Sequence, residues 1–119
     1  IWMTKEGINN SAGNLCLHLI GNLKHFIGAT LGNTGYIRER DKEFSLKNIP
    51  KSDLISSVHE TKSIVLKTLQ KLSAEDLEKD FPLEKHNKIV TTENMLMHLL
   101  IHLGYHLGQI NYHRRILAQ

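Results

Sequence analysis

The stretch HLLIHLGYHLGQINYH, residues 98–113, holds four of the eight histidines of the chain and no lysine, arginine, aspartate or glutamate. Apolar residues recur in it at spacings of three and four, which is the period of an α-helix. The pattern begins at about residue 92, after a capping threonine, and runs to about residue 117. Apolar residues lie nearly all round this helix, which is typical of an element buried on several sides.

Two more long helices and one short helix are expected upstream. Residues 11–31 and 53–72 repeat apolar side chains at helical spacing, with Asn10 or Ser11 as the first N-cap and Ser52 as the second. Ser73 begins a capping-box sequence that predicts a short helix over about 74–79. The sequence therefore predicts an all-α fold in a single domain, residues 1–119.

Three long helices leave apolar faces uncovered, because a helical bundle of this kind usually has a fourth helix. The chain begins at Ile1 and not at methionine, so we expect further residues before it in the native protein. A helix in that preceding part or a second copy of the chain would supply the cover. We expect both to contribute.

Composition and charge argue against several classes of protein. The 119 residues are 40% hydrophobic and 23% charged, as in a folded globular domain. The formal net charge of +3 comes with scattered lysines and no basic stripe interleaved with aromatic residues, which argues against nucleic-acid binding. Residues 94–113 are long enough to span a bilayer, but their four histidines, two asparagines and one glutamine argue against a membrane helix.

The single cysteine, Cys16, allows neither an internal disulfide nor a cysteine-based zinc cluster. It lies between Leu15 and Leu17, where a small buried hydrophobic residue is expected in preference to a catalytic thiol. No signal peptide is visible in the sequence, and a cytoplasmic location is expected.

His102 and His106 lie four residues apart on one face of the predicted terminal helix. At this spacing two imidazoles of one helix can bind the same ion. His98 and His113 are too distant for all four to share an ion. Each is expected either to form hydrogen bonds in the core or to line the mouth of the site.

A third ligand is expected from the helix over residues 11–31, because two histidines alone make a weak site. His18 lies on an apolar stretch of that helix and has no acidic residue near it in the sequence. We therefore expect a site of His18, His102 and His106, with positions left open for water or substrate. The alternative for each residue is a hydrogen-bonded core histidine without an ion.

Other polar side chains are assigned around this site. Asn22 and Gln109 are expected to orient an imidazole or a bound water. The remaining histidines lie beside charged or polar residues and are expected at the surface: His25, His59 and His86.

Two arginines lie in the charged connection between the first two long helices, residues 36–50. Arg38 and Arg40 are expected to form ion pairs with Asp41 and Glu43. The alternative is that they bind a substrate carboxylate, because the guanidinium group recognises carboxylates in a bidentate manner.

Three motifs, HLIGNLKHFI (18–27), GYIRERDKEF (35–44) and HLGYHLGQINYH (102–113), together resemble the DinB-like superfamily of metal-binding four-helix bundles over about residues 11–119. The chain is most similar to the branch with an Arg-x-Arg-Asp-x-Glu-Phe connection, here residues 38–44. The resemblance implies an up-down bundle, often dimeric, whose first helix would precede Ile1. It also implies a divalent ion (zinc, nickel, iron or manganese), and the residues that match its three ligands are His18, His102 and His106.

Relatives in that superfamily include thiol-dependent S-transferases and isomerases that use mycothiol, bacillithiol or glutathione, and some described as hydrolases. The resemblance thus implies a metal-dependent enzyme, with thiol transfer as the first expectation. A metal-dependent hydrolase and a noncatalytic metal-binding stress-response protein are the alternatives. The expected partners are a second copy of the chain, a low-molecular-weight thiol and a small electrophile. No catalytic residue is assigned, and the candidates to position the acceptor are His98, Asn22, Gln109 and Tyr105.

Overall fold

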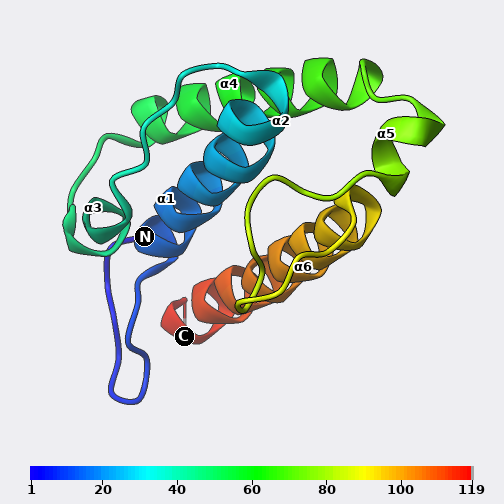
Figure 1. Ribbon diagram of the computed structural model, residues 1–119. Helices are drawn as coiled ribbons and strands as arrows, with labels where there is room; N and C mark the ends of the chain where they lie inside the picture. The colour runs from blue at the N-terminus through cyan, green and yellow to red at the C-terminus, as the bar shows by residue number, and fades with distance from the viewer. Residues whose placement is uncertain (119) are drawn as a thin grey trace.

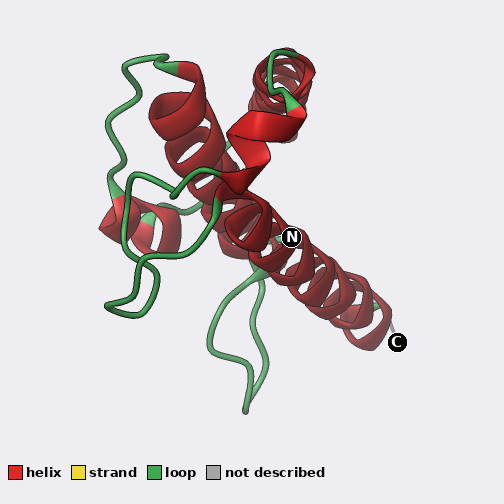
Figure 2. Ribbon diagram, turned by 45° about the vertical axis from the view of Figure 1, so that its right-hand side comes forward, coloured by secondary structure: helices red, strands yellow, loops and turns green. Residues whose placement is uncertain are grey.

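The computed structural model describes residues 1–118 and is all-α, with no strand among these residues. The first long helix is made up of α1 (Ala12–Leu23), the π-helical segment η1 (Lys24–Ala29) and α2 (Thr30–Gly32), and the other two are α4 (Lys51–Gln70) and α6 (Thr92–Leu117). Two short helices, α3 (Arg40–Ser45) and α5 (Ala74–Glu78), lie in the connections. Figure 2 shows these helices and the loops that join them. The N-terminal segment before α1 projects away from the helices.

The helix ends follow the capping chemistry of the sequence in most places. The side chains of Ser11, Ser73 and Thr91 each accept a hydrogen bond from a backbone N–H in the first turn of α1, α5 and α6. The expected cap of α4 at Ser52 is wrong. Pro50 precedes the first turn instead, and its carbonyl accepts from the N–H of Asp53, so that Ser52 lies inside the helix.

The first long helix is continuous from α1 through η1 to α2 and lies between α4 and α6 (Figure 1). It contacts both neighbours, whereas α4 and α6 do not contact each other. Helices α1 and α6 run antiparallel (Figure 1). The hydrophobic core is a cluster of four buried side chains: Ile27, Phe81, Met95 and Leu99.

The expectation that α6 is buried on several sides is wrong for the described chain. Only four of its residues are buried: Thr92, Met95, Leu99 and His113. Leu100 and Ile101 remain 68% and 69% exposed, because α1 and α5 are the only described helices whose backbones come close to α6. No fourth long helix closes the layer among residues 1–118.

An apolar groove follows from this open arrangement. Two adjoining cavities of about 320 and 390 Å³ share Leu23, Val65 and Leu103, which come from α1, α4 and α6. Cys16 lies in the wall of this groove, where it is half-buried, and burial raises the pKa of its thiol. Within the described residues, no helix is both long and apolar enough to cross a membrane.

Candidate metal centre

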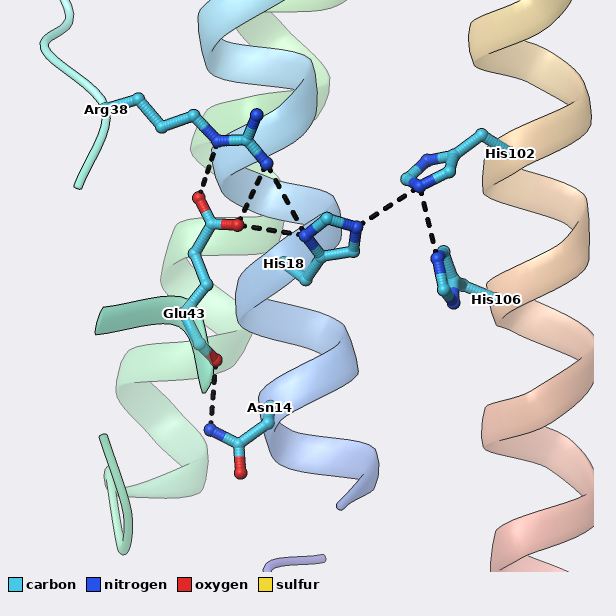
Figure 3. A network of polar contacts seen from close by, with 6 residues as sticks. All are labelled: Asn14, His18, Arg38, Glu43, His102 and His106. Atoms are coloured by element: carbon cyan, nitrogen blue, oxygen red, sulfur yellow. Dashed lines mark hydrogen bonds and ion pairs between the residues drawn. The ribbon is translucent and has the colours of Figure 1, made fainter. Parts of the chain in front are cut away.

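Three histidines from α1 and α6 meet where these helices contact each other (Figure 3). His18 comes from α1, and His102 and His106 come from successive turns of α6. The Nε2 atom of His102 lies 3.2 Å from Nε2 of His18 and 3.1 Å from Nε2 of His106. One ring nitrogen from each residue lies within 4.8 Å of the others, so the group could hold a metal ion.

The Nε2–Nε2 distances of 3.1 and 3.2 Å are short enough for hydrogen bonds and close to those of a shared ion, and the number of available protons favours the ion. A neutral imidazole carries a single N–H, which leaves too few protons to satisfy three converging ring nitrogens and their outer partners. Two nitrogen ligands of one tetrahedral zinc ion, each at about 2.0–2.1 Å, lie about 3.3–3.4 Å apart. Imidazole nitrogen is a donor that suits zinc, copper, iron and nickel.

The opposite edge of the His18 ring faces a carboxylate that the sequence analysis did not connect with it. His18 Nδ1 lies 2.9 Å from Oε1 of Glu43, a residue of α3 that is only 6% exposed. Arg38 donates to both carboxylate oxygens, through Nε at 2.8 Å and Nη2 at 2.9 Å. This is the bidentate geometry that makes arginine–carboxylate pairs strong and directional.

The expected ion-pair network of the charged connection is thus confirmed for one pair, Arg38 and Glu43. Arg40 instead lies over the ring of Phe44, with 5.4 Å between its guanidinium carbon and the ring centroid. The only sequence signal for Glu43 is an acidic residue followed by phenylalanine in a charged segment. That signal does not reveal that the carboxylate turns inward toward His18.

Two features of α1 hold α3 against the site. Asn14 is fully buried and its Nδ2 donates to the backbone carbonyls of Glu43 and Leu46, at 3.0 and 2.8 Å. Gly21 leaves the space that the Glu43 carboxylate occupies, since an added Cβ would lie 2.6 Å from its Cδ. The sequence around His18 therefore carries both a clamp for α3 and room for its carboxylate.

Gln109 contacts His106, as expected for a residue that orients an imidazole. Its Oε1 accepts from His106 Nδ1 at 2.7 Å, and its Nε2 donates to the hydroxyl of Tyr105 at 3.3 Å. Asn22 is buried, but its Oδ1 has no hydrogen-bond partner among the described residues, so the expected contact to an imidazole is not seen.

The other histidines lie outside the three-histidine cluster. His98 stacks on His102, with ring centroids 6.4 Å apart, and His113 is buried in α6. His59 and His86 are exposed, as expected. The expectation of a surface position is wrong for His25, which is half-buried and packs its ring against Phe26 at 4.7 Å.

Burial favours the neutral form of two of the three imidazoles, His102 and His18. Burial is the largest cause, and together with the neighbouring His106, His18, His98 and Arg38 it lowers the pKa of His102 to about 4. Burial also lowers the pKa of His18, although the neighbouring Glu43 opposes this shift. Neutral imidazoles have a free lone pair, which is the form that binds a metal ion.

A cavity of about 480 Å³ opens beside His106, between α6 and the N-terminal segment. Its walls include no charged side chain, and its hydrogen-bonding groups come from the following residues: Asn9, Asn10, Tyr105, His106, Gln109, Tyr112 and His113. A larger cavity of about 580 Å³ lies around α2, α4 and α5 and includes none of the histidines. Of these two cavities, the one beside His106 adjoins the cluster.

The model of one protein family, described as "Protein of unknown function (DUF1572)", matches residues 1–119. No curated protein and no solved structure matches the chain.

Proposed function

We propose that this chain, which belongs to the DUF1572 family, binds one divalent metal ion through His18, His102 and His106 and catalyses the transfer of a small thiol to an electrophile. The observation that supports the ion most directly is the convergence of three Nε2 atoms at distances close to those of a shared tetrahedral ion. Three nitrogen ligands leave at least one coordination position open, which distinguishes catalytic zinc sites from closed structural ones.

The ion would supply one kind of chemistry: when bound at open positions, a thiol or a water loses its proton near neutral pH and becomes a nucleophile. The residues of the chain have other tasks. The three imidazoles hold the ion, and Gln109 keeps the ring of His106 turned toward it. The cavity beside His106 receives the acceptor.

The character of this cavity limits the acceptor. Because its walls carry amide, hydroxyl and imidazole groups but no charged side chain, it suits an uncharged molecule that forms hydrogen bonds. Gln109 contacts both His106 and Tyr105, so Gln109 and Tyr105 connect the cavity to the cluster. Tyr105 and Gln109 would therefore position the acceptor.

Thiol transfer is favoured over hydrolysis by the resemblance of the three sequence motifs to the DinB-like superfamily. The same resemblance supports an up-down four-helix bundle, and the groove between α4 and α6 has the place for a further helix beside the three long ones.

The expected homodimer can be checked by analytical ultracentrifugation of the untagged chain, which measures the mass of the particle in solution. Two chains per particle support the homodimer, and a single chain contradicts it.

One experiment separates the possible functions. The untagged protein, loaded with zinc or nickel, is incubated with mycothiol, bacillithiol or glutathione and a panel of uncharged electrophiles. Thiol consumption that depends on the metal supports the transferase. Metal-dependent cleavage of esters or amides without thiol indicates the hydrolase instead. Stoichiometric metal binding without either reaction indicates a noncatalytic metal-binding protein.

A further inference from the structure

We propose that Glu43, held by Arg38, is a positioning residue of the metal centre: it keeps the proton of His18 on Nδ1 and thereby points the Nε2 lone pair at the ion. This inference rests on the proposed metal site and adds the short helix α3 to it. The residues concerned are drawn together in Figure 3.

The hydrogen-bond partners of His18 determine which ring nitrogen carries the proton. An ionised carboxylate only accepts hydrogen bonds, so the contact of 2.9 Å between Nδ1 and Oε1 of Glu43 requires a proton on Nδ1. Arg38 Nη2 lies 3.4 Å from the same nitrogen, but an arginine only donates, and a protonated Nδ1 cannot accept. The shorter contact to the charged oxygen is therefore the hydrogen bond. Nε2 then holds the lone pair, on the side that faces His102.

Burial of His18 and Glu43 favours this one orientation of the His18 ring. His18 and Glu43 are each 6% exposed, and a buried carboxylate is costly unless it is paired and hydrogen-bonded. Arg38 supplies two donors to the carboxylate, while Asn14 holds the backbone carbonyls of Glu43 and Leu46. With the carboxylate held by all of these contacts, rotation of the His18 ring would leave a buried charge without one of its partners.

The residue directly before α3, Glu39, offers a matched control. Glu39 forms an ion pair with Lys42 at 2.8 Å, but both side chains are more than half exposed and face solvent. Such exposed pairs contribute little to stability. Loss of the Glu39 charge changes the net charge of the chain as much as loss of the Glu43 charge does, without touching His18.

A consequence is that metal binding and the docking of α3 are coupled. The ion favours the His18 tautomer with a free Nε2, and this tautomer is the one that donates to Glu43. Coupling between two sites is reciprocal, so the bound ion also stabilises α3 against α1.

The first test measures zinc affinity by competition with a chromophoric chelator, on the untagged full chain. Glu43→Gln keeps the shape of the side chain and removes its charge, and we expect it to weaken zinc binding by about 10- to 100-fold. Glu39→Gln is expected to bind zinc as the unchanged chain does. Equal affinities of the Glu43→Gln variant and the unchanged chain would overturn the positioning role.

The second test reads the tautomer itself, which a merely structural role of Glu43 would not fix. The ¹⁵N chemical shifts of the His18 ring in the metal-free, unchanged chain should show a protonated Nδ1 and a free Nε2. Protonation at Nε2 instead would sink the proposal. This measurement decides the question even if Glu43→Gln does not fold, because it needs no variant.

The two proposals fail in different ways. If the unchanged chain binds neither zinc nor nickel, the proposed function is wrong and the positioning role falls with it. If the unchanged chain binds zinc but Glu43→Gln binds it equally well, only the role of Glu43 is wrong.

Discussion

The Nε2 atom of His18 lies 3.2 Å from the Nε2 atom of His102, although the two residues are 84 positions apart in the sequence. At this distance two lone pairs repel each other, so a proton or a cation has to lie between the two nitrogens. His102 has no hydrogen-bond partner for its other nitrogen, Nδ1, among the described residues. A cation shared with His106 removes the conflict for all three rings, and most of the following predictions depend on it.

Substitution of a ligand should remove the ion. Protein purified without a histidine tag is expected to contain about one divalent ion per chain, and His18→Ala or His102→Ala should abolish binding, because two remaining imidazoles make a weak site. Elemental analysis of the purified proteins measures this. His86→Ala, at an exposed residue, is the control and should keep the ion. Full occupancy in His18→Ala would show that the three-histidine assignment is wrong.

Removal of the ion should lower thermal stability. An ion that binds only the folded state at 100 times its Kd stabilises it by about 2.7 kcal/mol. For a chain of this size that corresponds to a decrease in Tm on the order of 10 °C when a chelator is added. Scanning calorimetry with and without the chelator checks this value. His102→Ala should melt at the same temperature in both conditions, and a chelator effect that persists in this variant would point to a different binding site.

The metal-free protein should lose stability in acid because of His102. The pKa of this residue is lowered to about 4 in the folded state, below its ordinary value of about 6.5, so the unfolded chain binds the proton first. The free energy of unfolding therefore decreases as the pH falls from about 6.5 toward 4. Urea denaturation at several pH values measures the slope. His102→Gln removes the titrating group and should show a shallower decrease; an unchanged slope would contradict the assignment.

A methyl group at Gly21 should disturb the site, whereas one at Gly104 should not. Gly21→Ala places a Cβ against the Glu43 carboxylate, and overpacking of this kind costs about 1–3 kcal/mol. It should also weaken zinc binding, because Glu43 is displaced from His18. Gly104 has open space around it, so Gly104→Ala should raise helix stability by roughly 0.5–1 kcal/mol. Chemical denaturation and chelator competition measure both effects, and an undisturbed Gly21→Ala would refute the close approach.

The long helices could be predicted from the sequence because their signals are local. The period of apolar residues and the threonine before it are enough to place α6, and the spacing of His102 and His106 follows from the helix itself. His18 could be added because it is a histidine on an apolar face of another helix. In each case the deciding residues lie within a few turns of one another.

The contact between His18 and Glu43 could not be predicted in this way. The two residues are 25 positions apart, and their approach depends on how the connection after α2 turns back along α1. Asn14 and Gly21, which guide that return, have many other uses in helices. The exposure of α6 was missed for a related reason: the apolar pattern shows what a helix can bury, but it does not show which neighbour covers it.

The separation of the ligands along the chain has a consequence for the order of events during synthesis. Asn14, His18, Arg38 and Glu43 all emerge from the ribosome before any residue of α6, so their half of the centre can assemble while translation continues. The proposed ion would have to wait until His102 and His106 have been added. Under the proposed function, metal binding would therefore be a late step in the maturation of this protein, at a half-site whose histidine already contacts Glu43.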